Sequence, residues 1–198
     1  DAAIDQLIAI AGQAQLALPQ KDRRTVMIHG QFLRQDQIKK LKKLGIFPAL
    51  YPMHTFYWGD WHRDSVLGLE RGSRISPTAS SLAKGITFTV HNDAPIVPPD
   101  VMRLIWATTN RLTRSGQVLG PNERISVEEA LKAVTLNAAY QYFEEDRKGS
   151  IEVGKQADFV VLSANPLSVA KENLLNIKVL QTIARGTTVF SLEDETAE

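Results

Sequence analysis

Apolar residues recur with helical spacing in two stretches of the first 45 positions. Near the start, Ile4, Leu7, Ile8 and Ala11 follow the i, i+3, i+4, i+7 rule, which predicts an amphipathic helix. The stretch DQIKKLKKLG repeats this pattern and closes at Gly45, a residue type that commonly ends helices. Its four lysines fall on the opposite side, so we interpret them as a solvated helix face and not as a phosphate-binding patch.

Three short apolar or β-branched runs predict buried strands, and each run ends in a histidine. The runs are TVMIH, ALYPMH and FTVH, and they end at His29, His54 and His91. Between the second and third runs, the aromatic stretch TFYWGDWHRD predicts a loop. It is followed by a short helix with Ser76 as its N-cap and Gly85 as its stop. Strands that alternate with helices are typical of a parallel sheet with crossover helices.

The second half of the chain changes from helical to alternating patterns. A helix is predicted from about residue 100 to residue 115, and another begins with a capping box formed by Ser126 and Glu129. Beyond about residue 147, the runs GSIEVGKQADFVVLSANPL and VLQTIARGTTVF alternate and contain glycine turns, as hairpin strands do. We therefore predict an α/β fold, with residues 1–146 in one part and residues 147–198 in a small β module.

Composition narrows the class of protein without identifying a site. The chain has 198 residues, of which 43% are hydrophobic and 23% charged, and its formal net charge is +1. This near-neutral balance gives no electrostatic footprint for nucleic acid. No apolar run approaches the roughly 20 residues that a membrane span needs, so neither nucleic acid nor membrane is expected as a partner. There is no cysteine, which excludes disulfides and thiolate chemistry.

The strand ends carry the candidate chemistry. Three of the four histidines end the predicted strands, and Asp93 lies two residues beyond the third. The carboxyl ends of parallel strands meet at one edge of a sheet, so these side chains should converge there. Histidine is the commonest metal ligand and general base near neutral pH. Two other interpretations stay open: each histidine could be a core or loop residue, and Asn92 with Asp93 before a proline is also a common turn composition. The fourth histidine, His62, is expected in a loop.

Three strand–helix units do not make a complete fold. A closed barrel takes eight strands, and an open three-stranded parallel sheet would leave two edges unpaired. The chain also opens inside a helical pattern without an initiator methionine. We therefore expect it to be a piece of a longer protein, with any targeting segment before Asp1. A cytoplasmic location is the expectation.

Five stretches, taken together, resemble the C-terminal part of the amidohydrolase superfamily, in the group called amidohydrolase family 3. They are MIHGQFLRQDQIKKLKKLGI, YPMHTFYWGDWHRDSVLGLER, HNDAPIVPPD, ISVEEALKAVTLNAA and GSIEVGKQADFVVLSANPL. The resemblance covers nearly the entire chain. It implies a TIM-type (β/α)8 barrel of which this chain carries the last three strand–helix units, together with the C-terminal half of a small β-sandwich module.

The resemblance also implies a reaction and roles for single residues. The reaction is hydrolysis of a C–N bond, in an amide, cyclic amide or amidine and not in a peptide, by a metal-bound hydroxide. The cofactor is a divalent metal, expected to be zinc, as one or two ions. His29 matches the metal ligand of the sixth strand, and Asp93 matches the aspartate of the last strand, which binds metal and carries the proton. His54 matches a histidine expected to face substrate. His91 departs from the commoner pattern, which has a small residue there, and is treated as a pocket residue.

The family's remaining metal ligands are not in this chain. The pattern needs a His-x-His pair on the first strand and further ligands on the fourth and fifth strands, and DAAID resembles the residues that follow the fifth-strand ligand. The isolated chain is therefore expected to be inactive. Its expected partners are a small-molecule substrate and the upstream half of the barrel, from the same gene product or a separate chain, in an assembly compatible with a homodimer. The alternative function is a non-catalytic, small-molecule-binding protein that kept the fold.

Overall fold

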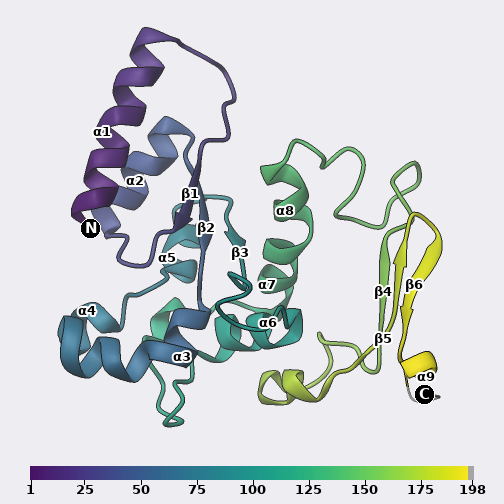
Figure 1. The fold of residues 1–198 in the computed structure, drawn as a ribbon. Coiled ribbons are helices and arrows are strands. Elements are labelled where there is room, and N and C mark those ends of the chain that lie inside the picture. The colour runs from purple at the N-terminus through teal and green to yellow at the C-terminus, as the bar shows by residue number, and fades with distance from the viewer. Residues whose placement is uncertain (196–198) are drawn as a thin grey trace.

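The computed structural model describes residues 1–195 and shows an α/β chain with two separate sheets (Figure 1). The strands are β1 (Val26–His29), β2 (Phe47–Leu50), β3 (Thr89–Val90), β4 (Phe159–Leu162), β5 (Val179–Ala184) and β6 (Thr187–Ser191). The α-helices are α1 (Ala2–Ala17), α2 (Gln35–Leu44), α3 (Met53–Trp61), α4 (Gly68–Gly72), α5 (Thr78–Ala83), α6 (Val101–Asn110), α7 (Val127–Val134), α8 (Leu136–Gln141) and α9 (Leu192–Glu195). A π-helix η1 (His62–Leu67) and two 3-10 helices, η2 (Pro121–Glu123) and η3 (Lys171–Asn176), complete the elements.

The first sheet is parallel, with the strand order β1-β2-β3. His29 is paired with Leu50 on β2, and Leu50 is paired with Val90 on β3, so the three strands end at the same level. Helices α1 and α2 lie side by side next to β1 (Figure 1). They enclose a small core in which Ile38 and Leu41 of α2 are fully buried. The amphipathic patterns expected for both helices are therefore confirmed.

A second, larger core lies at the β2 and β3 end of the parallel sheet. It joins the apolar ends of β2 and β3 to α6 and α7, with Leu50, Val90, Ile105 and Ala130 all buried. Helix α6 starts where expected, because the Asp100 carboxylate accepts a hydrogen bond from the Arg103 backbone N–H at 2.9 Å. This core fixes β3 and the residues that follow it.

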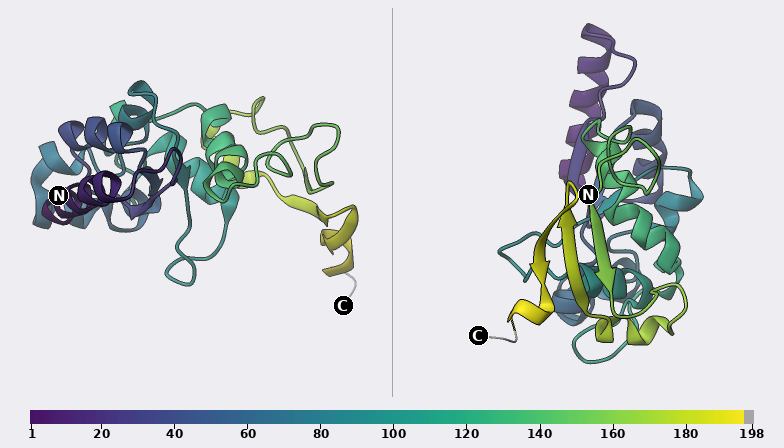
Figure 2. Two further views of the ribbon diagram at one scale, coloured as in Figure 1. Left: turned by 90° about the horizontal axis from the view of Figure 1, so that it is seen from above. Right: turned by 90° about the vertical axis from the view of Figure 1, so that its right-hand side faces the viewer.

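The second sheet is antiparallel, with the order β4-β5-β6, and lies to the side of the parallel sheet (Figures 1 and 2). The hairpin strands expected beyond residue 147 are present. Between β4 and β5 the chain returns to the larger core through η3, where Leu174 is fully buried. The Asn110 side-chain amide donates to the Lys171 carbonyl at 2.9 Å. The second sheet is thus attached to the end of α6.

Two of the differences from the expected elements concern α3 with η1, and α6. The segment expected to be an aromatic loop is helical and forms α3 and η1. The helix expected to reach residue 115 ends at Asn110, because Arg111 adopts a left-handed conformation with φ +55°. The Arg111 side chain is fully buried and donates hydrogen bonds to the carbonyls of Ile75, Ser76 and Leu119. These contacts bring the chain at residue 111 back toward the loop that precedes α5.

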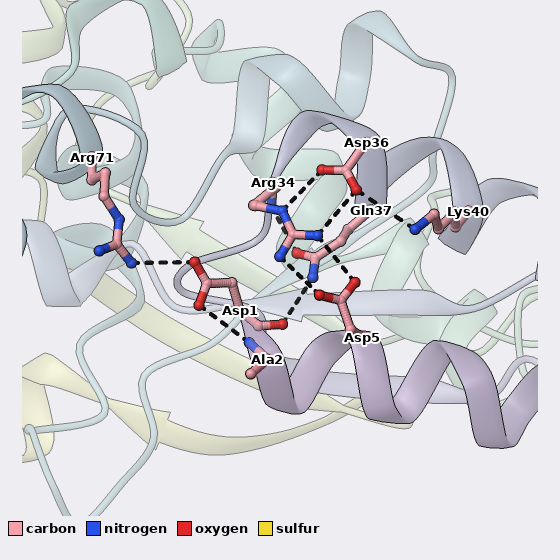
Figure 3. Close-up of polar contacts among 8 residues, drawn as sticks. All are labelled: Asp1, Ala2, Asp5, Arg34, Asp36, Gln37, Lys40 and Arg71. Carbon is pink, nitrogen blue, oxygen red and sulfur yellow. Dashed lines mark hydrogen bonds and ion pairs between the residues drawn. The ribbon is translucent and has the colours of Figure 1, made fainter.

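A polar network joins the start of α1 to α2 (Figure 3). The Arg34 guanidinium donates to both carboxylate oxygens of Asp5 at 3.0 and 3.1 Å and also binds Asp36. The Gln37 side chain donates to the Asp1 backbone carbonyl at 2.8 Å, and Arg71 contacts the Asp1 carboxylate at 3.2 Å. The network links the start of α1 to α2 and to α4.

Gly120 occupies a backbone conformation that a larger residue cannot share. Its φ is +68°, and an added Cβ would overlap the carbonyl oxygen of Ser73. We expect Gly120→Ala to lower the free energy of unfolding by about 2–3 kcal/mol, because it combines left-handed strain with a backbone clash. Urea unfolding followed by tryptophan fluorescence measures this change. Gly116→Ala is the matched control, since Gly116 has φ +80° but no atom within 4 Å of the added Cβ, and should cost about 1 kcal/mol. Equal losses in both variants would contradict the clash.

Apolar side chains are exposed on both sheets and on α1. Ile28 of β1 is 58% exposed, Leu16 and Leu18 at the end of α1 are 84% and 70% exposed, and Val160 and Val189 of the second sheet are 54% and 62% exposed. We expect the isolated chain to associate or aggregate, since unpaired strand edges beside apolar surface pair with other molecules. Light scattering during size-exclusion chromatography tests this expectation, and a monomer with a sharp thermal transition would contradict it.

Among the described residues, no helix has the length and apolar character needed to cross a lipid bilayer.

Candidate metal centre at the carboxyl ends of the parallel strands

The parallel sheet brings the expected site residues to one edge. His29 is the last residue of β1, His91 follows directly after β3, and Asp93 lies two residues beyond His91. The His91 backbone N–H donates to the Leu50 carbonyl at 3.1 Å, which extends the sheet by one residue. The side chains at the ends of the two outer strands thus meet at the carboxyl end of β2, as the alternation of strands and helices predicts.

His29, His91 and Asp93 form a compact cluster. The His29 Nδ1 atom lies 3.2 Å from His91 Nε2, and His29 Nε2 lies 3.8 Å from Asp93 Oδ2. One potential ligand atom from each residue lies within 4.8 Å of the others. The His29 side chain is 40% exposed and that of Asp93 is 34% exposed. A small molecule or an ion can therefore reach both residues.

The backbone at His29 and Asp93 is left-handed, which is uncommon for residues other than glycine. His29 has φ +67° and Asp93 has φ +55°, both in the left-handed region that non-glycine residues seldom adopt. Such conformations cost of order 1–3 kcal/mol each and concentrate at functional sites, where the surrounding structure holds them. The two positions with the best-matched chemistry are thus also positions of backbone strain.

The donor set fits a divalent metal ion. Two ligands about 2 Å from one ion, at a tetrahedral angle, lie roughly 3.4 Å apart. The 3.8 Å between His29 Nε2 and Asp93 Oδ2 is close to this value. Imidazole nitrogen and carboxylate oxygen are both zinc ligands. The residues present can therefore supply two of the ligands of such a site.

His54 reaches the same edge from a helix and not from a strand end. Strand β2 stops at Leu50, and His54 lies in the first turn of α3, so the expected strand end at residue 54 is wrong. Its ring centre is nevertheless 5.7 Å from that of His29. The buried Nδ1 atom of His54 finds no hydrogen-bond partner among the described residues. Burial, and then the neighbouring His29, lower the pKa of His54 to about 3, so the ring is neutral near pH 7.

Tyr51 lies among the histidines, and sequence reasoning did not single it out. Its ring centre is 4.3 Å from that of His54 and 5.1 Å from that of His91, and the side chain is 1% exposed. The hydroxyl has no hydrogen-bond partner within the described part of the chain. Burial, and then Asp93, raise the pKa of Tyr51 to about 12. Its position directly after a buried strand is the sequence signal that could have identified it.

His62 was expected to lie in a loop, but it is buried in η1. The ring is 6% exposed, and its Nδ1 donates to the Trp58 carbonyl at 2.9 Å. Its Nε2 then accepts from the Gln31 side-chain amide at 3.0 Å. Burial lowers the pKa of His62. Because Gln31 follows His29 by two residues, this contact helps to hold the segment after β1.

A separate cavity of about 330 Å³ opens beside α2 and α4. Phe32, Arg34, Arg71 and Arg74 line part of it, and none of the candidate site residues does. Each of the three arginines is already paired with a carboxylate: Arg34 with Asp5 and Asp36, Arg71 with Asp1, and Arg74 with Glu70. We therefore place the candidate chemistry at the strand ends and not in this cavity.

The chain is similar to known proteins both in sequence and in structure. Residues 1–190 match the model of a family described as the amidohydrolase family. The chain is similar to an N-substituted formamide deformylase of Arthrobacter pascens, with 29% identity over 163 residues, which covers 80% of this chain and 29% of that protein. The chain spans about a third or less of the length of the first curated relatives it matches.

Solved structures of two hydrolytic enzymes are also similar to this chain. An uncharacterized metal-dependent hydrolase from Pyrococcus furiosus superposes with a TM-score of 0.69 and 27% identity, covering 85% of this chain and 32% of that chain. An adenosine deaminase from Xanthomonas campestris, solved with bound zinc, superposes with a TM-score of 0.62 at 18% identity, covering 91% of this chain and 43% of that chain. At that identity the second likeness concerns the fold alone.

Proposed function

Because the chain belongs to the amidohydrolase family, we propose that it is the C-terminal part of a metal-dependent hydrolase that cleaves C–N bonds. The observation that carries this proposal is the approach of His29 Nε2 to Asp93 Oδ2, at 3.8 Å on an accessible edge of the parallel sheet. The two side chains come from different strands, 64 residues apart in the sequence, and both keep a strained backbone. A simple turn around Asp93 would not require this convergence.

His29 and Asp93 would hold the metal in this proposal. Bound by these residues, a divalent ion such as zinc would supply Lewis acidity and would make a water molecule a stronger nucleophile near pH 7. Asp93 is proposed to act as a general base and then as a general acid: one carboxylate oxygen takes a proton from the attacking water and later passes it to the leaving nitrogen. Its partial exposure leaves it open to the substrate. The number of ions, one or two, depends on ligands outside this chain.

His54 and His91 are proposed to line the substrate pocket beside these residues. A neutral His54 ring, whose centre lies 5.7 Å from that of His29, suits a polar uncharged group of the substrate. The relative from Arthrobacter pascens is named as acting on N-substituted formamides, which contain such a group and a C–N bond. We therefore propose small amides of this type as the first substrates to test.

The proposed enzyme needs further strands to complete the site. Two ligands from this chain leave a zinc ion short of the three protein ligands that catalytic zinc sites use. The exposed apolar side chains of β1 and α1 are the surfaces that an upstream half of a barrel would cover. The chain alone is therefore proposed to be inactive, and the full-length protein to be active.

The test measures bound metal and hydrolysis together on the full-length protein. We expect about one or two equivalents of a divalent metal, release of amine from an N-substituted formamide, loss of this activity on chelation, and recovery when zinc is added. A folded full-length protein that stays inert across a panel of amides after zinc loading would contradict the proposal. Tight binding of a small molecule that is insensitive to chelator and gives no turnover would favour a non-catalytic binding protein instead.

A further inference from the structure

We propose that His91 fixes the tautomer of His29: it accepts a hydrogen bond from His29 Nδ1–H and so leaves His29 Nε2 unprotonated toward Asp93. This inference rests on the proposed function, since it concerns how one proposed metal ligand is prepared. His91 acts here through His29 and is a positioning residue. The role is additional to the contact with substrate proposed above.

The first step is the geometry between the two rings. Their ring centres are 5.0 Å apart and their planes differ by 18°, while the nearest nitrogens, His29 Nδ1 and His91 Nε2, are only 3.2 Å apart. Nitrogens that are this much closer than the ring centres point toward each other along the ring edges. This is the approach that a ring N–H···N hydrogen bond requires, so exactly one of the two nitrogens carries the proton.

The second step decides which nitrogen donates. In the proposed site, His29 Nε2 is the nitrogen that faces Asp93 and would bind the metal, so it carries no proton. A neutral imidazole carries a single N–H. The proton between the rings therefore belongs to His29 Nδ1, and His91 presents a bare Nε2 to accept it.

The third step concerns the other nitrogen of His29. The 3.8 Å between His29 Nε2 and Asp93 Oδ2 is too long for a hydrogen bond, so the carboxylate does not hold a proton on Nε2. With its proton on Nδ1, His29 directs the Nε2 lone pair toward Asp93. A histidine that binds metal usually donates its other N–H to a fixed acceptor, which sets the ring orientation and raises the basicity of the ligand nitrogen.

The surroundings keep His91 in place for this contact. Its ring packs against that of Tyr51, with centres 5.1 Å apart and planes 22° apart, and Tyr51 is almost fully buried. The His91 backbone N–H is bound to Leu50 at 3.1 Å. The His91 ring, which carries the acceptor nitrogen, is therefore held in place both by the sheet and by the Tyr51 ring.

The tautomers can be read without metal and without activity. In the metal-free full-length protein labelled with 15N in its histidines, two-bond 1H–15N spectra distinguish protonated Nδ1 from protonated Nε2. His29→Gln and His91→Gln assign the signals. We expect His29 and His91 each to carry the proton on Nδ1. A proton on His29 Nε2 would overturn the inference.

Zinc affinity, measured by competition with a chelator, gives the second readout. His91→Phe keeps a planar ring but has no acceptor, and should weaken zinc binding about 10–100-fold, the usual cost of losing such a partner. His91→Gln places an amide oxygen near the Nε2 position and should stay within about threefold of the parent. Circular dichroism and thermal midpoints verify that both variants fold.

The outcomes separate the inference from the proposed function. Unchanged zinc affinity in His91→Phe would overturn the positioning role, and equal large losses in both variants would make His91 itself a metal ligand. A parent protein that binds no zinc, but shows both Nδ1 tautomers, would sink the proposed metal chemistry while supporting the hydrogen bond between the two rings.

Discussion

Replacing Asp93 by asparagine is expected to lower the turnover rate of the full-length enzyme by at least about 10²-fold, or roughly 3 kcal/mol of barrier. Asparagine keeps the size and shape of the side chain but cannot take a proton from the attacking water. The thermal midpoint should move little, because Asp93 is partly exposed and makes no close-packed contact in the core clusters. Amide hydrolysis and thermal unfolding, measured on one purified variant, test both statements.

A chemically identical change at Asp100 is the matched control. Asp100 lies seven residues further along the chain and caps α6 through the Arg103 backbone N–H. Asparagine is also a good N-cap residue, so Asp100→Asn should leave both turnover and stability close to the parent. If the only role of Asp93 were to stabilise the turn in which it lies, its replacement would change stability and leave turnover nearly normal. Turnover of Asp93→Asn within threefold of the parent would end its catalytic assignment.

Replacing His29 by alanine is expected to remove most of the bound zinc and to lower turnover by more than about 10²-fold. Loss of an outer partner of a ligand already costs 10–100-fold in affinity or activity, and loss of the ligand itself removes a metal bond. Metal analysis after dialysis and a zinc titration measure the effect. Lys39→Ala, on the exposed face of α2, is a control that should retain the parent's zinc content. Full zinc occupancy in His29→Ala would exclude His29 as a ligand.

The local elements were predictable where one short-range rule decides them. Gly45 ends α2 in a left-handed conformation with φ +64°, and the Ser126 hydroxyl accepts from the Glu129 backbone N–H, as the sequence indicates. The meeting of His29 with Asp93 was also predictable, because parallel strands that end at one level bring their last residues together. That prediction used topology and required no knowledge of side-chain packing.

The segment of α3 and η1 escaped prediction for a physical reason. Its aromatic residues stand at adjacent positions in TFYWGDW and not on one stripe, so no amphipathic period is visible. The helix packs on several sides, with Thr55 and Gly59 buried as well as Met53. Its neighbours, and not its own pattern, stabilise it. The burial of His62 and the place of His54 in a helical turn follow from the same cause.

Tertiary contacts also overrode two local signals near the site. Ser76 was expected to cap a helix, but its backbone N–H donates to the Gln31 carbonyl and its hydroxyl donates to the Tyr51 carbonyl at 2.9 Å. The helix therefore starts at Thr78. Arg111 falls inside the helix that was expected to reach residue 115, but it ends the helix and is fully buried. A charged residue bound by three distant carbonyls leaves no trace in a single sequence.

Because η3 packs into the larger core, the second sheet cannot be truncated or exchanged without affecting that core. Leu174 and Ile177 fill a space beside α6, and Asn110 holds the Lys171 carbonyl. Cutting the chain before the second sheet would thus remove two apolar side chains from the layer that supports β3 and Asp93. The sheet of β4, β5 and β6 is therefore not an exchangeable cassette: a chimera that swaps it has to carry η3 with it, or rebuild the pocket on α6 that receives Leu174.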